Sequence, residues 1–168
     1  MPKLVKDGAI VDDVWTRLPK PEGEDAASVS VPEGQVIVPL SVWLAQKSQL
    51  QGRTDIGVWL DSDETADMIG GEAASLPLIA VNFPTFMDGR AFSTARLLRE
   101  RYGFTGELRA VGNFIRDQLC YLRRCGVNAF AFSNPDIDLQ AALKSLNDFT
   151  EYYQASVDQP LPLFRRRA

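Results

Sequence analysis

Two charged turns carry the residue types most able to bind an anion. In the first, Arg90 could offer a bidentate guanidinium to a small oxyanion while Asp88 fixes its direction. In the second, Arg116 and Asp117 could complete the site, with Arg116 reaching back to Asp88. An arginine pair with a carboxylate can bind and polarise an anionic substrate without a metal or a histidine, so these four residues are the candidate catalytic groups. The predicted ligand-binding set is Asp88, Gly89, Arg90, Asn113, Arg116, Asp117 and Gln118.

The same residues also have a purely structural interpretation. Asp88-Gly89 is a favourable turn, and Arg90 can be a surface charge. Asp117 suits a helix N-terminus for electrostatic reasons alone, and an Arg116–Asp88 ion pair would simply link two loops. The sequence leaves both interpretations open.

Both turns belong to the stretch from Pro77 to Phe132, in which short β-rich runs alternate with longer segments of helical period. Strands separated by a helix are most simply parallel. Ligand sites in open parallel sheets gather beyond the carboxyl ends of the strands, which here are residues 82–90, 112–118 and 133–136. We therefore expect the two turns to lie at one rim of the sheet.

The predicted fold is a three-layer α/β domain with about five mainly parallel strands preceded by a β-hairpin. The hairpin turns at Asp7-Gly8, a favoured two-residue turn. The alternative is a half-barrel of βα units that completes itself by dimerising. The strands are expected near Val36, Ile56, Leu78, Leu108 and Ala129.

We expect a single domain over residues 1–168, with four parts. These are a hairpin (1–17), a mobile loop rich in Pro, Glu, Gly and Ser (18–34), the α/β core (35–154) and a tail (155–168). Within the core, Ser41 is predicted to cap a helix, and Asn134-Pro135-Asp136 is predicted to open the last helix, which runs to about Gln154.

Composition narrows the chemistry further. The net charge of −4 argues against a nucleic-acid partner. With no histidine and two cysteines, the chain lacks the commonest general base and cannot supply an all-cysteine zinc or iron–sulfur site. No glycine-rich phosphate-binding motif is present, so we expect no bound cofactor and no metal. No segment resembles a signal peptide or membrane span, which makes the cytoplasm the expected location.

Several runs of residues also resemble a known family. The runs FP-x-F-x-DGR, S-x-ARLLRER-x-G, GELRAVG, RDQL-x-YLRRCG and DF-x-x-x-YQ stand in this order along the chain. They are similar to an uncharacterised bacterial family, the domain of unknown function 934, described as a probable oxidoreductase involved in sulfite reduction. The resemblance covers about Val36 to Gln154. It implies a place in assimilatory sulfite reduction, whose sirohaem and iron–sulfur cluster this chain has no residues to hold.

Three hypotheses follow. The first is an accessory protein of sulfur assimilation that binds sulfite reductase, its reductant-supplying partner or a small oxyanion, without carrying a redox cofactor. The second is a metal-free enzyme acting on a small anion through the Arg/Asp residues. The third is a structural interaction module, for which a homo-oligomer is one form.

Overall fold

The β-rich runs of the sequence form one curved sheet, described here from a computed structural model that covers residues 2–23 and 25–146. In this part of the chain the sheet has eight strands in the order β2-β1-β8-β7-β6-β5-β4-β3. Strands β3 to β8 are parallel and follow chain order, whereas β1 is antiparallel to both β2 and β8. The strands are β1 (Lys3–Lys6), β2 (Ala9–Asp12), β3 (Thr16–Arg17), β4 (Val36–Pro39), β5 (Ile56–Leu60), β6 (Leu78–Phe83), β7 (Glu107–Gly112) and β8 (Ala129–Phe132).

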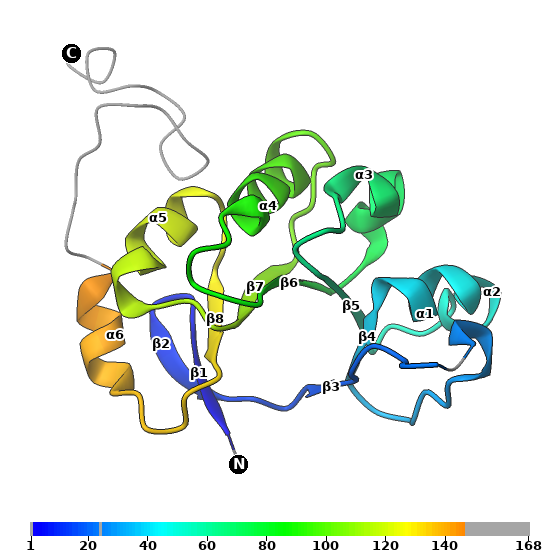
Figure 1. Cartoon of the computed structure of the whole chain (residues 1–168), viewed down its shortest axis with the longest axis horizontal. Helices are drawn as coiled ribbons and strands as arrows, with labels where there is room; N and C mark the ends of the chain where they lie inside the picture. The colour runs from blue at the N-terminus through cyan, green and yellow to red at the C-terminus, as the bar shows by residue number, and fades with distance from the viewer. Residues whose placement is uncertain (1, 24, 147–168) are drawn as a thin grey trace.

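Helical segments connect the parallel strands. The α-helices are α1 (Leu40–Ala45), α2 (Lys47–Leu50), α3 (Ala66–Ile69), α4 (Arg90–Glu100), α5 (Leu119–Arg124) and α6 (Leu139–Ser145). Short 3-10 helices are η1 (Ala26–Ser28), η2 (Gly70–Ser75) and η3 (Arg116–Gln118). Because every crossover advances one strand in the same direction, right-handed connections place their helices on one face, and Figure 1 shows them along the outer side of the arc. The α/β class is confirmed, and the half-barrel is the arrangement that forms.

The two faces of the sheet have different cores, because alternate strand residues point in opposite directions. Outward-facing residues such as Val58, Val81 and Phe130 are buried against the helices in the larger cluster. The inner face is smaller and is built from Ile37, Trp59, Leu78, Ala80 and Val111. This inner cluster is buried although none of the described helices covers it, so another segment shields it.

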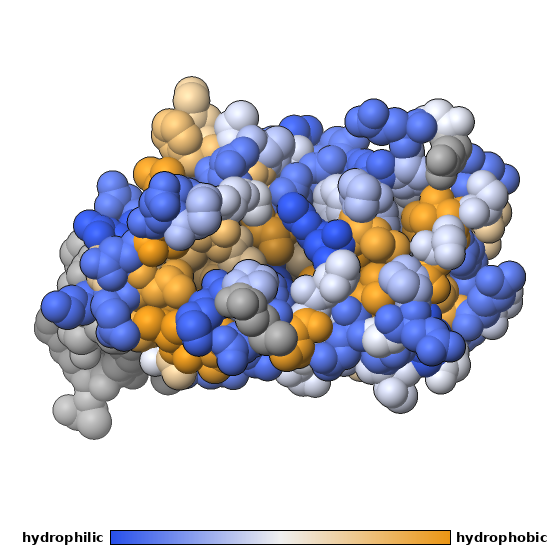
Figure 2. Space-filling view, turned by 90° about the horizontal axis from the view of Figure 1, so that it is seen from below, coloured by the Kyte–Doolittle hydropathy of each residue, from blue (hydrophilic) through white to orange (hydrophobic). Residues whose placement is uncertain are grey.

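The shield is the segment Asp13–Trp15, which we call the strap. It leaves β2 at one edge of the sheet and enters β3 at the other, so it crosses the open side of the arc (Figure 1). Trp15 packs against the inner cluster from this position. Seen from below, this side of the molecule shows hydrophobic residues between hydrophilic ones (Figure 2). The strap therefore supplies the inner face with part of the cover that an isolated half-barrel would lack.

The predicted hairpin is confirmed, with one addition. Strands β1 and β2 pair around Asp7 and Gly8, whose φ angles of 50° and 78° match a tight primed turn. The addition is β3: Thr16 and Arg17, which were predicted to belong to the hairpin segment, pair instead in parallel with Val36 and Ile37 of β4. The described chain thus has six parallel strands, one more than expected.

Both predicted N-terminal helix caps, Ser41 and Asn134, are wrong. Helix α1 begins at Leu40, after Pro39, so Ser41 lies inside it. Helix α6 is capped by Asp138, whose carboxylate accepts hydrogen bonds from two first-turn amides. Asn134 instead accepts the backbone N–H of Asp136 and closes a local turn before the helix, an arrangement typical of asparagine. The predicted end of this helix near Gln154 and the tail lie outside the described residues.

Residues 18–34, predicted to be a mobile loop, make specific contacts. The side-chain amide of Gln46 donates to the carbonyls of Ala26 and Val29 at 2.9 and 2.7 Å. Arg53 donates to the carbonyls of Pro32 and Gly34 at 3.1 and 3.0 Å. The side chains that hold this segment lie outside it, in Gln46 and Arg53, so the composition of the segment alone could not predict these contacts.

Candidate functional site

The two predicted turns meet at the carboxyl rim of the sheet, held together by amide groups. The backbone N–H of Asn113 donates to Phe83 O at 2.7 Å, and its side-chain amide donates to Pro84 O at 2.9 Å. The side-chain amide of Gln118 donates to Phe86 O at 2.8 Å. The loop after β7 is therefore fastened to the loop after β6, as the parallel arrangement predicts.

Gly112 allows this close approach. Its φ is 96°, and a Cβ there would lie 2.4 Å from Phe83 O and 2.6 Å from Asn82 Oδ1. A side chain at this position would collide with the end of β6 as well as strain the backbone. The glycine therefore sets the spacing of the two strand ends that carry the predicted site.

Asp88 and Arg90 form a bidentate pair within the first turn. The guanidinium donates to the two carboxylate oxygens at 3.0 and 2.7 Å, and it also donates to Ser62 Oγ at 2.9 Å. The hydrogen bonds from Arg90 hold the pKa of Asp88 well below its usual range. The pair links the loop after β6 to the loop after β5 through Ser62. Gly89, between them, lies just before α4 as its N-cap.

Arg116 does not pair with Asp88, contrary to the sequence-based expectation. The carboxylate of Asp88 is already occupied by Arg90. Arg116 and Asp117 both lie exposed in η3, and neither forms an ion pair with any residue of 2–23 or 25–146. Of the two arginines in the predicted site, Arg90 is therefore neutralised by Asp88, whereas Arg116 has no ion pair among the described residues.

A pocket of about 320 Å³ lies beside Arg116. Asn113 and Ser133 contribute polar groups from the loops after β7 and β8, and Phe86 and Phe132 contribute apolar walls. Phe86 is 50% exposed, which places part of this wall at the surface. We call this cavity the rim pocket. Its position at the carboxyl ends of parallel strands is the usual one for ligands in α/β proteins.

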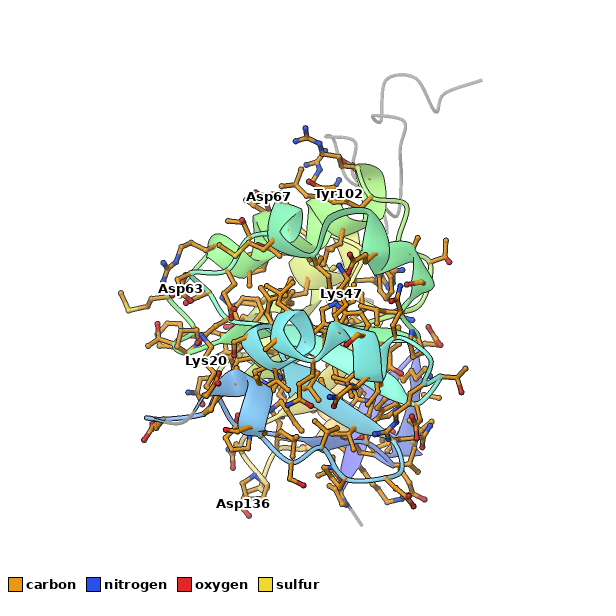
Figure 3. The ribbon with its side chains drawn as sticks, turned by 90° about the vertical axis from the view of Figure 1, so that its right-hand side faces the viewer. Lys20, Lys47, Asp63, Asp67, Tyr102 and Asp136 are labelled. Carbon is orange, nitrogen blue, oxygen red and sulfur yellow. The ribbon has the colours of Figure 1, made fainter. Side chains whose placement is uncertain are left out.

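A second charged group on the rim was not anticipated from the sequence. Lys20 lies within 3.0 Å of Asp61, 3.2 Å of Glu64 and 3.7 Å of Asp63, and Figure 3 shows Lys20 and Asp63 on the same side of the molecule. Asn82 Nδ2 donates to Asp61 Oδ1 at 3.0 Å. Through Asp61, which follows β5, these contacts join the loop after β3 to the end of β6. They stabilise the part of the rim formed by β3, β5 and β6.

The inner face holds a buried ionic chain that sequence reasoning also missed. The guanidinium of Arg109, 3% exposed, lies 2.9 Å from Asp13 and 2.8 Å from Glu107, and Glu107 is 3.0 Å from Lys6. The signal was the alternation of Glu107 and Arg109 within an otherwise apolar strand. Two charges at period two place a polar stripe on one face of β7.

The fold and the rim together define an α/β half-barrel with a candidate ligand site at the carboxyl ends of its strands. The chain belongs to the family of bacterial proteins of unknown function DUF934, whose sequence pattern matches residues 57–164. Comparison with curated proteins gives no match, and comparison with solved structures gives none either. None of the helices in the described ranges has the length and apolar character needed to cross a membrane.

Proposed function

We propose that this protein is an accessory component of sulfite reduction that binds a small oxyanion in the rim pocket. One observation carries the proposal: Arg116 lines a pocket of about 320 Å³ and has no ion pair among the described residues. An uncompensated arginine offers five N–H donors in a fixed fork, which fits the oxygen atoms of sulfite or a related anion.

The neighbouring groups support a polar ligand. Asn113 brings a side-chain amide with a second N–H besides the one donated to Pro84 O. The Ser133 hydroxyl donates its only proton to Gly112 O at 2.7 Å, so it adds polarity to the pocket but no donor for the anion. Arg90 contributes less to anion binding in this arrangement, because Asp88 already neutralises it. Of the two arginines proposed from the sequence, Arg116 is therefore the one that would hold the ligand.

The place in sulfite reduction rests on the resemblance of the sequence runs to a family described in those terms. Binding of an oxyanion is compatible with delivery or retention of sulfite near a reductase. On this proposal the electrons and their cofactors belong to the reductase partner.

Calorimetric titration of the purified protein with sulfite, and with chloride as the reference anion, tests the binding step. Arg116→Ala should weaken sulfite binding by about tenfold or more, because it removes hydrogen bonds to a charged group. The control is Arg96→Ala, which removes another exposed arginine, one that pairs with Glu100 on α4. Sulfite binding that is absent, or unchanged in Arg116→Ala, would refute the rim pocket as the site.

A growth experiment tests the physiological step. Deletion of the gene should impair growth on sulfite as sulfur source and leave growth on cysteine normal. Restoring the wild-type gene should recover growth on sulfite, and restoring the Arg116→Ala gene should not. Equal growth of the deletion strain on both sulfur sources would remove the assignment to sulfite reduction.

A further inference from the structure

A second pocket opens on the inner side of the half-barrel. It has a volume of about 190 Å³ and is bounded by the strap, by Arg17 of β3 and by inner-face residues of β7 and β8. Gly112, Phe132 and Ser133 line both this inner pocket and the rim pocket, so the two cavities adjoin at the carboxyl ends of β7 and β8. The inner pocket is nevertheless made mostly from other residues.

Arg17 lines the inner pocket and makes no direct ion pair with a described residue. Its guanidinium lies 5.4 Å from the ring centroid of Trp59. Lys20 also lies near this ring, at 5.8 Å, but it is engaged by Asp61 and Glu64. Arg17 is exposed, and partial desolvation of its guanidinium lowers its pKa, which the charge of Asp61 offsets only in part. A cation held against an apolar ring without a counter-ion favours an incoming anion.

The other charges of the inner pocket are already balanced. Asp13, which lines the pocket, pairs with Arg109 at 2.9 Å. Arg109 directs its remaining donors to Glu107 at 2.8 Å. An anion entering the pocket would therefore meet a neutralised carboxylate at Asp13 and a net positive charge at Arg17.

The rest of the lining suits a flat apolar group. Trp15 is partly exposed and presents an aromatic ring on the strap side. Ala131 and Gly112, which also line the pocket, are small and take up little of its volume. The ring of Trp59 is fixed because its Nε1 donates to Leu18 O at 2.8 Å, and this keeps Arg17 at the pocket wall. Aromatic surface beside a cation is an arrangement that binds planar anions.

We infer that the inner pocket binds a small aromatic anion, with its ring against Trp15 and its negative group at Arg17. This site is separate from the oxyanion site of the rim pocket and does not depend on it. Because the pockets share Ser133 and Gly112, a ligand in one would lie next to a ligand in the other.

Tryptophan fluorescence tests the inference directly, because Trp15 lines the pocket and Trp59 lies against Arg17. Benzoate should produce a saturable change. Benzamide, which has the ring without the charge, and inorganic phosphate, which has a charge without the ring, should each bind about tenfold or more weakly. Absence of a saturable change with benzoate would overturn the inference, and so would equal binding of benzamide.

Variants locate the site and separate it from the rim pocket. Arg17→Gln should weaken benzoate binding by about tenfold or more and leave sulfite binding unchanged, whereas Arg116→Ala should leave benzoate binding unchanged. A substitution at Arg17 could disturb the two-residue edge strand in which it lies, so Trp15→Phe is the second variant. It keeps an aromatic ring on the strap. The fluorescence change should become smaller, while benzoate binding measured by calorimetry persists. Undiminished benzoate affinity in a folded Arg17→Gln protein would refute the site.

Discussion

Asp13 and Arg109 lie 96 residues apart in the sequence and 2.9 Å apart in the structure. Asp13 belongs to the strap, and Arg109 belongs to the inner face of β7. Asp13 also accepts the backbone N–H of Trp15 at 3.1 Å. One carboxylate therefore fastens the strap to the sheet and fixes the start of the segment that carries Trp15.

Asp13→Ala should lower the free energy of unfolding by about 2–3 kcal/mol, because it removes one partner from a buried arginine. This loss is at or below the lower end of the range of about 3–5 kcal/mol for breaking a buried ion pair, because Glu107 remains beside the guanidinium of Arg109. Urea denaturation followed by circular dichroism measures it. The matched control is Asp12→Ala, which removes an exposed pair with Lys3 and should leave the free energy of unfolding nearly unchanged. Equal losses in the two variants would contradict the role given to Asp13.

Asp88 should titrate below the ordinary aspartate pKa of about 3.9, because Arg90 stabilises its charged form. Since the pKa is lowered in the folded state, the associated stabilisation is present above the ordinary value and is lost as the pH falls toward the lowered one. Carbon-detected NMR titration of the Asp88 carboxyl group measures the shift. Arg90→Gln should return the pKa toward its ordinary value, and Arg96→Gln should leave it unchanged. An ordinary pKa in the wild type would sink the prediction.

Gly112→Ala should destabilise the protein more than Gly34→Ala. The two glycines have nearly equal φ angles, 96° and 94°, so the backbone strain of about 1–2 kcal/mol is common to both. Only at Gly112 would the added Cβ meet other atoms within 4 Å, the nearest being Phe83 O. Urea denaturation of both variants isolates the steric part as their difference. A difference near zero would mean that the strand ends can separate without cost.

Gln118→Ala should loosen the junction between the loops after β6 and β7. The variant loses the hydrogen bond to Phe86 O and the one that Gln118 Oε1 accepts from Ile115 N, so we expect a loss of about 1–2 kcal/mol. Amide hydrogen exchange should show faster exchange at Ile115. Gln49→Ala, an exposed substitution within α2, is the control and should change neither quantity appreciably. Unchanged exchange at Ile115 would count against the bond.

Much of the fold follows from local sequence patterns. The runs near Val36, Ile56, Leu78, Leu108 and Ala129 form strands because short β-branched and aromatic runs recur between helical segments, and this pattern is visible without tertiary information. Glycines at 103 and 126 end helical segments with φ angles of 64° and 100°, as expected for left-handed caps. These features depend on neighbours within a few residues.

The features that were missed depend on distant partners. Thr16–Arg17 is too short to show a periodic pattern, and it becomes a strand only because Val36 and Ile37 lie beside it. The partner of Arg109 in the strap lies 96 residues away, whereas the expected contact of Asp88 with Arg90 does form and occupies the carboxylate that Arg116 was expected to reach. The sequence pattern predicted that the two rim turns lie side by side. It could not decide which acidic residue pairs with each arginine, because several are candidates and only the three-dimensional arrangement selects among them.

The pairing of β1 with β8 has a consequence for biosynthesis. The hairpin pairs with the sheet through Val5 and Lys6, opposite Phe130 and Ala129, and the backbone N–H of Asp7 donates to Asn128 O. This docking surface leaves the ribosome long after the hairpin itself. A two-stranded hairpin is marginally stable alone. During synthesis the parallel strands and their helices should therefore fold first. The hairpin, although it is synthesised earlier, should dock only after β8 has been made.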